Sequence, residues 1–421
     1  MIRDMYTYLS NQTFAGGFDV GMVQAGFKLL HKTEDKGGFG MANCLANRHV
    51  LGQDWTSQVS PPDQWEVKDA DVVVGNPPCS GWSVMAAKHF RGSDSPALSC
   101  TWNFANYAAR VKPYIAVFES VQQAFTHKDG LTVMRQLREL LERKTGFQYE
   151  LFHVRHNAYG LGGCAKRPRY FWVASRIPFG IEVPEPADPM PTFRDVISDL
   201  APLNIQWEAQ PYDAGSPVHP WTQQLVNPAG TVDGHVTVNN PLTRRLGDLM
   251  EGAEWKQGES LAQVVKRYYE QHGRLPESWS ATQDKIIGKD FMLGFTTPTR
   301  WRGDGASRVI TGGSMQLVIH PDLNRTITHR EAARVLGFPD NWLIDPLRNV
   351  SGLTMTWGKG ISTHCGKWIG QWVHRALEGN PGTYKGAPMG DREWDVNVTN
   401  AFKPTWKPAP SVTPQIATVV Q

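Results

Sequence analysis

This 421-residue sequence lacks the features that would mark a membrane, secreted or metal-binding protein. It has no run of about 18 apolar residues, so we expect no membrane span, and its first residues lack the apolar core of a signal peptide. The five cysteines are an odd number and form no pairs with metal-ligand spacing. We therefore expect free thiols, no bound metal and a reducing cytoplasm, that of a host cell if the source is viral.

Charge and composition set only loose limits on function. The net charge of +3 neither requires nor excludes nucleic acid. The length allows one large domain and a smaller second one. Sixteen tryptophans is a high count, which suits the stacking of bases and equally suits an aromatic core.

The most informative stretch reads DVVVGNPPCSGWS and runs from Asp71 to Ser83. Its continuous β-branched start, Asp71–Val74, predicts a short buried strand. Two prolines then restrict the backbone and end the strand, so Cys79 lies on a rigid turn just past its carboxyl end. Open α/β sheets build active sites there, although a buried structural cysteine is the simpler interpretation of a single cysteine.

A glycine turn follows the first expected strand, Met5–Ser10. Gly16 and Gly17 stand between that strand and a helix expected over Val20–Leu30. Glycines at such a turn let a ligand approach the backbone closely at a helix N-terminus.

Two acidic residues follow other expected strands. Glu34 comes directly after a strand ending at His31–Thr33, where a Rossmann-like fold carries the acid that binds ribose hydroxyls. Glu119 follows the strand Tyr114–Phe118. Taken alone, a carboxylate at the end of a strand is usually a solvated charge.

A helix is also predicted late in the chain. Thr328 is a good N-cap, Glu331 completes a capping box three residues later, and Gly337 ends the helix.

Taken in their order along the chain, these stretches resemble the motifs of the DNA (cytosine-5)-methyltransferase family. The matching segments are GNPPCSGWS for the usual GGPPCQGFS, FAGG for FAGxGG, Glu119-Ser120-Val121 for ENV, Arg167-Pro168-Arg169 for the end of QxRxR, Arg325–Asp340 for RxLTxREAARLQGFPD, and Gly358–Ser362 for GNAVP.

The resemblance implies an α/β fold: a Rossmann-like, mostly parallel sheet with helices on both faces, as in class I methyltransferases, plus a smaller target-recognition domain. We expect a catalytic and cofactor-binding domain over residues 1–180 and the recognition domain over 181–318. The chain would return to the catalytic domain over 319–380 and finish as an extended tail over 381–421.

The resemblance also implies roles for individual residues. Cys79 would attack carbon 6 of a flipped cytosine as a covalent nucleophile with a lowered pKa. Glu119 would bind the cytosine ring, and Arg169 its carbonyl oxygen, supported by Arg167. The expected cofactor-binding residues are Phe14, Ala15, Gly16, Gly17, Glu34, Asp54, Pro78 and Lys359. The expected DNA-binding residues are Ser83, Arg244, Arg245, Arg302 and Arg308, of which the arginines are equally a solvated basic face.

Lys359 departs from the family pattern, which has asparagine there. A lysine in a closed pocket is costly unless an anion meets it. The donor is therefore expected to be S-adenosylmethionine or, as a specific hypothesis, carboxy-S-adenosylmethionine, whose carboxylate would pair with Lys359. Alternatively, Lys359 points to solvent or pairs with a DNA phosphate or the donor's own carboxylate.

The expected partner is double-stranded DNA, bound by a monomer that does not associate with membranes. Two alternatives stay open: a catalytically silent DNA-binding relative, and an RNA cytosine methyltransferase.

Overall fold

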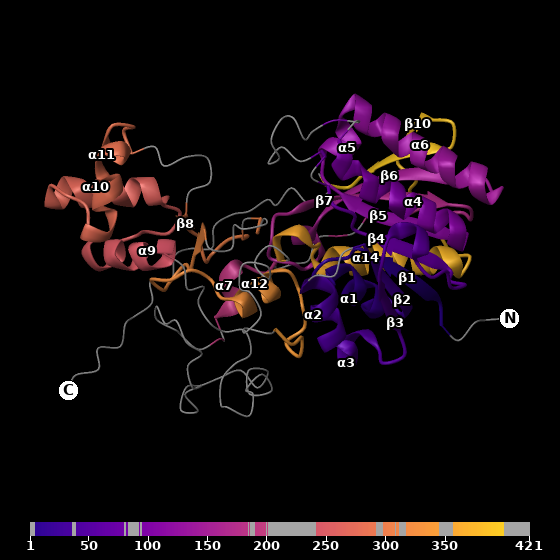
Figure 1. Ribbon diagram of the computed structural model, residues 1–421, viewed down its shortest axis with the longest axis horizontal. Helices are drawn as coiled ribbons and strands as arrows, with labels where there is room; N and C mark the ends of the chain where they lie inside the picture. The colour runs from indigo at the N-terminus through magenta and orange to yellow at the C-terminus, as the bar shows by residue number, and fades with distance from the viewer. Residues whose placement is uncertain are drawn as a thin grey trace.

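The computed structural model describes most of the chain up to Thr399. The described residues are 5–35, 39–79, 81–82, 92, 95–183, 185, 190–198, 200, 241–291, 298–307, 309–310, 317–344 and 357–399. Figure 1 shows a layered domain built on one large sheet and, at the other end of the molecule, a small helical unit.

Within these residues, a nine-stranded sheet forms the centre of the larger domain, in the order β10-β11-β6-β7-β5-β4-β1-β2-β3. β7 runs antiparallel to both neighbours and β10 runs antiparallel to β11, whereas the other pairs are parallel. The strands are β1 (Thr7–Asn11), β2 (Lys28–Glu34), β3 (Thr56–Val59), β4 (Val72–Gly75), β5 (Ile115–Ser120), β6 (Glu150–Asn157), β7 (Pro168–Ser175), β10 (Ala387–Gly390) and β11 (Glu393–Asn397). This confirms the expected mostly parallel sheet.

Helices cover both faces of the sheet, because side chains along its central strands alternate between two cores. Val72 and Val74 belong to the core of α1 and α14, whereas Val73 belongs to the core of α4 and α6. The helices of this domain are α1 (Gly17–Gln24), α2 (Phe39–Ala46), α3 (Arg48–Leu51), α4 (Ser99–Val111), α5 (Gln123–Thr126), α6 (Lys128–Thr145) and α14 (Thr363–Leu377). β4 and β5 are buried along their whole length, as their apolar sequences require.

The first helix is shorter than the sequence predicts. α1 ends at Gln24 and β2 already begins at Lys28, so the expected helix over Val20–Leu30 is wrong in its second half. Gly26 explains the difference, since its φ of +94° turns the chain directly into the next strand.

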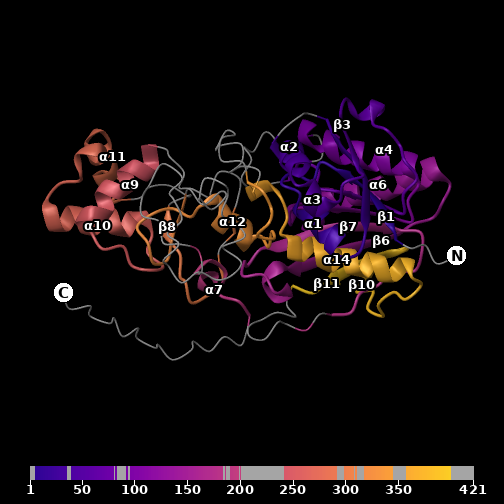
Figure 2. The ribbon, with the colours of Figure 1, turned by 90° about the horizontal axis from the view of Figure 1, so that it is seen from below.

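The helical unit has its own small core, which includes Leu249, Val264 and Trp279. It contains α9 (Pro241–Gly252), α10 (Leu261–His272) and α11 (Ser280–Ile287), and Figure 2 shows it again at the end away from the large sheet. Between the two lie the strand pair β8 (Thr299–Arg300) and β9 (Val318–Ile319), and the helices α7 (Phe193–Ile197) and α12 (His329–Val335). The expected domain boundaries at residues 180 and 318 stay predictions.

α12 begins and ends as its sequence predicts. Thr328 accepts from the Glu331 amide, and the Glu331 side chain accepts from the Thr328 amide. Gly337, two residues beyond the helix, has a φ of +79°. Arg325 adds a buried ion pair to Glu331 at 2.7 Å, which fixes the helix start against the preceding strand.

The expected extended tail over 381–421 is wrong for its first part. β11 joins the large sheet in parallel with β6, and β10 pairs with β11 at the sheet edge. Glu393 is 2% exposed and accepts from His153 Nε2 and Arg135 Nε, each at 2.7 Å. These long-range contacts, rather than a strong local pattern, order the segment; residues 400–421 lie outside the described part.

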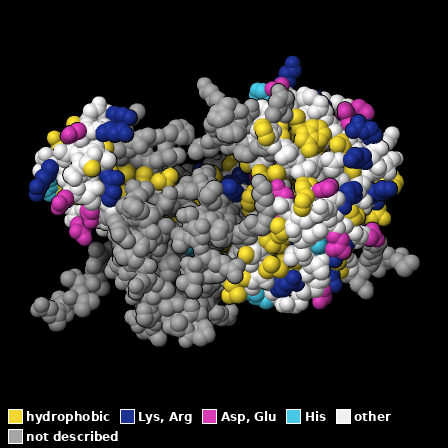
Figure 3. Space-filling view, in the orientation of Figure 1, with side chains coloured by type: hydrophobic (Ala, Val, Ile, Leu, Met, Phe, Trp, Pro, Cys, Tyr) yellow, Lys and Arg dark blue, Asp and Glu magenta, His cyan; other side chains and the backbone are white. Residues whose placement is uncertain are grey.

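Among the described helices, none has the length and apolar content that a bilayer crossing requires. On the face seen in Figure 3, the described basic side chains are mixed with acidic ones on both the helical unit and the sheet domain. This mixture agrees with the small net charge of +3.

Candidate active site

Cys79 and Glu119 are brought together by neighbouring parallel strands. Cys79 follows β4, and Glu119 lies one residue before the end of β5. Gly75 pairs with Phe118 in the register of the two strands, so both functional groups come to the same edge of the sheet. This is the edge at which open α/β sheets bind their ligands.

Two side chains hold the Glu119 carboxylate. Arg169, at the start of β7, forms an ion pair in which its Nε lies 3.1 Å from Glu119 Oε1. Asn76 donates from Nδ2 to Glu119 Oε2. Glu119 is 3% exposed, and burial raises its pKa to about 7 against the opposing effects of Arg169 and Asn76. Asn76 was not expected to have a role. The feature of the sequence that could have indicated one is that Asn76 stands where the family's usual GGPPC has a glycine.

The expectation of a lowered pKa for Cys79 is wrong for this structure. The pKa of the half-buried thiol is raised to about 11, mainly by burial and also by the charge of Glu119. Arg169 and Lys359 lower it, but by less. The thiol is therefore protonated at neutral pH in the protein without substrate.

The two arginines fix the segment that contains Lys359. Arg167, 2% exposed, donates from Nη2 to the carbonyl oxygen of Gly358 at 2.6 Å. Arg169 donates from Nη2 to that of Gly360 at 3.5 Å. Lys359 lies between these anchored carbonyls with its side chain exposed. This exposure agrees with the alternative expectation that Lys359 points to solvent rather than into a closed pocket, and within the described residues its ammonium has no hydrogen-bond or ion-pair partner.

The glycine turn lies against this same segment. A Cβ at Gly17 would collide with the carbonyl oxygen of Ile361, and one at Gly16 would lie 2.8 Å from Cys44 Sγ. The turn is also strained, since Gln12 and Phe14 have φ values of +53° and +47°. Such conformations cost on the order of 1–3 kcal/mol each in non-glycine residues. Both glycines are therefore required by close packing.

Glu34 ends β2 beside this turn. It is 7% exposed, and burial raises its pKa to about 7 while the ammonium of Lys32 opposes this rise. Phe14 and Pro78 are half-buried and Ala15 is buried, so these expected cofactor residues border the same edge of the sheet. A buried carboxylate beside a tightly packed glycine turn fits a donor that carries a ribose.

Asp54 is not brought to this site. It precedes β3 and forms an ion pair with Lys28 at 3.5 Å, at the amino end of β2. Glu34 lies at the carboxyl end of β2, so the strand separates the two carboxylates. Asp54 is also largely exposed, and its ion pair within the described residues lies at the amino end of β2.

The expected DNA-binding residues are only partly described. The guanidinium of Arg245 lies 4.1 Å from the ring centroid of Trp279 and donates to Thr282, which gives it a packing role in the helical unit. Arg302 is exposed and forms an ion pair with Asp304 at 3.0 Å. Ser83, Arg308 and the side chain of Arg244 lie outside the described residues.

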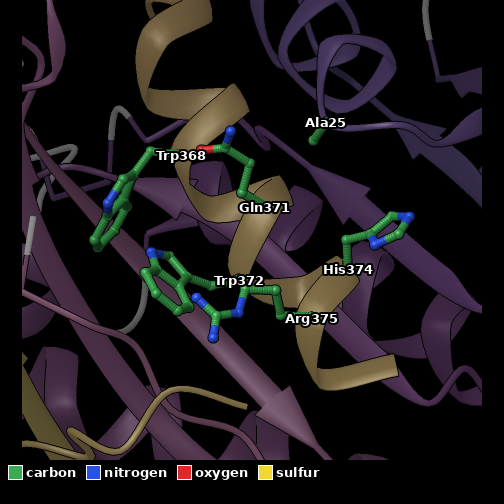
Figure 4. A pocket seen from close by; sticks show the side chains of 6 residues that line it. All are labelled: Ala25, Trp368, Gln371, Trp372, His374 and Arg375. Carbon is green, nitrogen blue, oxygen red and sulfur yellow. The ribbon is translucent and has the colours of Figure 1, made fainter. Parts of the chain in front are cut away.

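A separate cavity of about 480 Å³ lies on α14 (Figure 4). It is lined by Ala25, Trp368, Gln371, Trp372, His374 and Arg375. None of these residues belongs to the expected site. Within the described part of the chain, no cluster of three or more histidine, cysteine or carboxylate side chains has the arrangement of a metal site.

Comparison with known proteins agrees with this geometry. Residues 12–372 match the model of the family described as C-5 cytosine-specific DNA methylase. The chain is 25% identical over 363 residues to Type II methyltransferase M.DdeI of Desulfomicrobium norvegicum, covering 83% of this chain and 81% of that protein. It is 21% identical over 385 residues to Type II methyltransferase M.MthTI of Methanothermobacter thermautotrophicus, covering 90% and 99%.

Among solved structures, a DNA modification methyltransferase encoded within an E. coli prophage superposes with a TM-score of 0.61 at 16% identity. The match covers 89% of this chain and 99% of that one. At this level of identity, the likeness bears on the fold.

Proposed function

The chain belongs to the family of C-5 cytosine-specific DNA methylases, and we propose that it transfers an alkyl group from an S-adenosylmethionine-type donor to carbon 5 of cytosine in double-stranded DNA. The observation that carries the proposal is the placement of Cys79 beside a Glu119 held by Arg169 and Asn76. A nucleophile, a group that binds the ring and a cation then meet at one edge of the sheet.

Carbon 5 of cytosine becomes nucleophilic enough only after a nucleophile adds to carbon 6. The Cys79 thiol gives up its proton to water, and its sulfur bonds to carbon 6 as the 5,6 double bond opens and its electron pair moves into the ring. Glu119 binds ring nitrogen 3 and the amine, and Arg169 holds the carbonyl oxygen. Carbon 5 then bonds to the transferred carbon, and the donor leaves as a neutral thioether. Loss of the carbon 5 proton to a base re-forms the ring double bond and expels the Cys79 thiolate.

Glu119 couples the binding of cytosine to the activation of Cys79. Its negative charge is one cause of the raised pKa of the Cys79 thiol. When ring nitrogen 3 shares a proton with Glu119, this negative charge is reduced, so one of the two causes that raise the pKa of Cys79 is weakened, while burial still raises it and Arg169 and Lys359 lower it. The nucleophile is thereby favoured only when its substrate is in place.

The chain's own residues fit the donor. Gly16 and Gly17 form a turn with no room for side chains, and Glu34 presents a buried carboxylate to ribose hydroxyls. The donor supplies an electrophilic carbon on a positively charged sulfur.

For the group transferred, Lys359 favours carboxymethyl over methyl. The sulfur of either donor is already positive, so a lysine beside the transferred group is unfavourable for a plain methyl donor. A carboxylate on the migrating carbon would accept a charge-assisted hydrogen bond from Lys359, whose ammonium has no partner among the described residues. Carboxy-S-adenosylmethionine would then be the donor and 5-carboxymethylcytosine the product.

Two measurements test these proposals. DNA containing 5-fluorocytosine cannot lose a proton from carbon 5, so it should trap a covalent complex that Cys79→Ala abolishes. Trapping on an RNA substrate instead of DNA would reject the DNA assignment, and no trapping would reject the enzyme. Supplying both donors together and weighing the modified nucleosides decides the group, and exclusive methyl transfer rejects carboxymethyl.

A further inference from the structure

Lys32 is a fully buried lysine at the carboxyl half of β2, and none of the roles above uses it. Its side chain is 0% exposed. The ammonium donates to Thr13 Oγ1 and, at 3.1 Å, to Asp19 Oδ2, and it lies 3.9 Å from Glu34 Oε1. A buried ammonium is unfavourable unless acceptors and anions surround it, and here they come from three places in the donor site.

These partners stand at both ends of the glycine turn and at the expected ribose-binding residue. Thr13 lies at the start of the turn, and Asp19 lies in the first turn of α1 beyond it. Thr13 also donates to Asp19, so the two ends are joined directly as well as through Lys32. The lysine thus closes the base of a turn in which Phe14 has a φ of +47°.

We propose that Lys32 is a positioning residue for the donor: it joins the glycine turn to Glu34, holds both in one geometry, and places a positive charge beside the Glu34 carboxylate that accepts hydrogen bonds from ribose hydroxyls. This inference rests on the proposed function, because it requires a donor with a ribose at Glu34.

The charges that face Glu34 predict the direction in which the pKa of Glu34 should move in each variant. Lys32 lowers the pKa of Glu34, whereas Asp19 and Asp35 raise it. Cys44, buried beside them, stays neutral because its pKa is raised to about 12. Donor affinity should fall as pH drops through the pKa of Glu34, since the protonated acid accepts hydrogen bonds less well.

The test measures the binding of S-adenosylhomocysteine, the product common to both donors, by calorimetry from acidic to alkaline pH. Lys32→Met should weaken binding about tenfold near neutral pH, because the turn and Glu34 are no longer joined and less of Glu34 is ionised, and it should move the pH midpoint of binding upward. Asp19→Asn should move that midpoint downward. Lys28→Met is the matched control, because Lys28 lies at the other end of the same strand, where its ion pair within the described residues is with the exposed Asp54.

The outcomes are distinguishable. If Lys32→Met and Asp19→Asn both bind more weakly but keep the parent's pH midpoint of binding, Lys32 and Asp19 merely stabilise the turn, and the proposal is overturned. Unchanged binding by Lys32→Met would also overturn it. If Lys32→Met does not fold, Asp19→Asn is compared with the double variant Asp19→Asn/Lys32→Met. The double variant should have the higher midpoint, and equal midpoints overturn the proposal. No binding by the parent chain and the Lys28 control would instead overturn the proposed donor and this inference with it.

Discussion

Replacing Lys359 by asparagine should shift the choice of donor toward S-adenosylmethionine. A charge-assisted hydrogen bond contributes about 1.5–3 kcal/mol, and because Lys359 is exposed, solvent screening puts it near the lower limit. A loss of about 1.5 kcal/mol corresponds to a roughly tenfold fall in the preference for the carboxylated donor. The ratio of kcat/KM for the two donors, measured on the same DNA, gives this quantity directly.

Two further variants separate charge from position. Lys359→Arg keeps a cation between the two carbonyls anchored by Arg167 and Arg169, so it should retain most of the preference. Lys367→Asn removes another exposed lysine, on the following helix, and should leave the ratio unchanged. A Lys359→Asn protein with the parent's donor ratio would refute the reasoning, since the cation would then play no part in selecting the donor.

Four other predictions, which use five variants, concern the remaining structure. Cys79→Ser should abolish turnover yet leave thermal unfolding and S-adenosylhomocysteine binding unchanged, because a hydroxyl stays protonated near neutral pH; measurable turnover contradicts the covalent assignment. Asn76→Gly removes a hydrogen bond that lowers the pKa of Glu119, so the pH dependence of kcat/KM due to Glu119 should move to higher pH. Hydrogen bonds from His153 and Arg135 lower the pKa of Glu393 to about 2. Glu393→Gln should therefore lower the free energy of unfolding in urea by about 2–3 kcal/mol above pH 4.5. This difference from the parent should vanish as the pH falls toward 2, because Glu393 is then protonated. Arg302→Ala should weaken DNA binding by about 1–3 kcal/mol at fixed salt. Arg245→Ala should instead lower the unfolding temperature, because Arg245 packs on Trp279. Equal effects of the two variants on DNA binding would count against a DNA contact by Arg302 and a packing role for Arg245.

The sequence predicted the central part of the fold well because its signals there are local. The run Val72–Val74 is apolar on both faces, and the prolines after it mark its end. The capping box of Thr328 and Glu331 specifies a helix start within a few residues. Patterns of this kind need no knowledge of distant parts of the chain.

Other features depend on long-range contacts and were missed or wrong. β11 is ordered by contacts of Glu393 with His153 and Arg135, which no local pattern shows. The misplacement of Asp54 arose because a short motif match does not tell which end of a strand a residue occupies. The pKa of Cys79 depends on burial and on Glu119, and both follow only from the folded arrangement.

The anchoring of the Lys359 segment by Arg167 and Arg169 has a consequence for the order of events during synthesis. Each arginine is separated by 191 residues from the carbonyl oxygen that it contacts. Both arginines therefore leave the ribosome long before their acceptors are made, and β6 leaves it long before β11 can cover its edge. The catalytic centre is incomplete until Gly358 and Gly360 have been made, and the edge of β6 stays uncovered until β11 has been made as far as Asn397. Chains that stop between these two points would hold the catalytic residues and still be prone to associate through β6, so β11 protects the sheet rather than the chemistry.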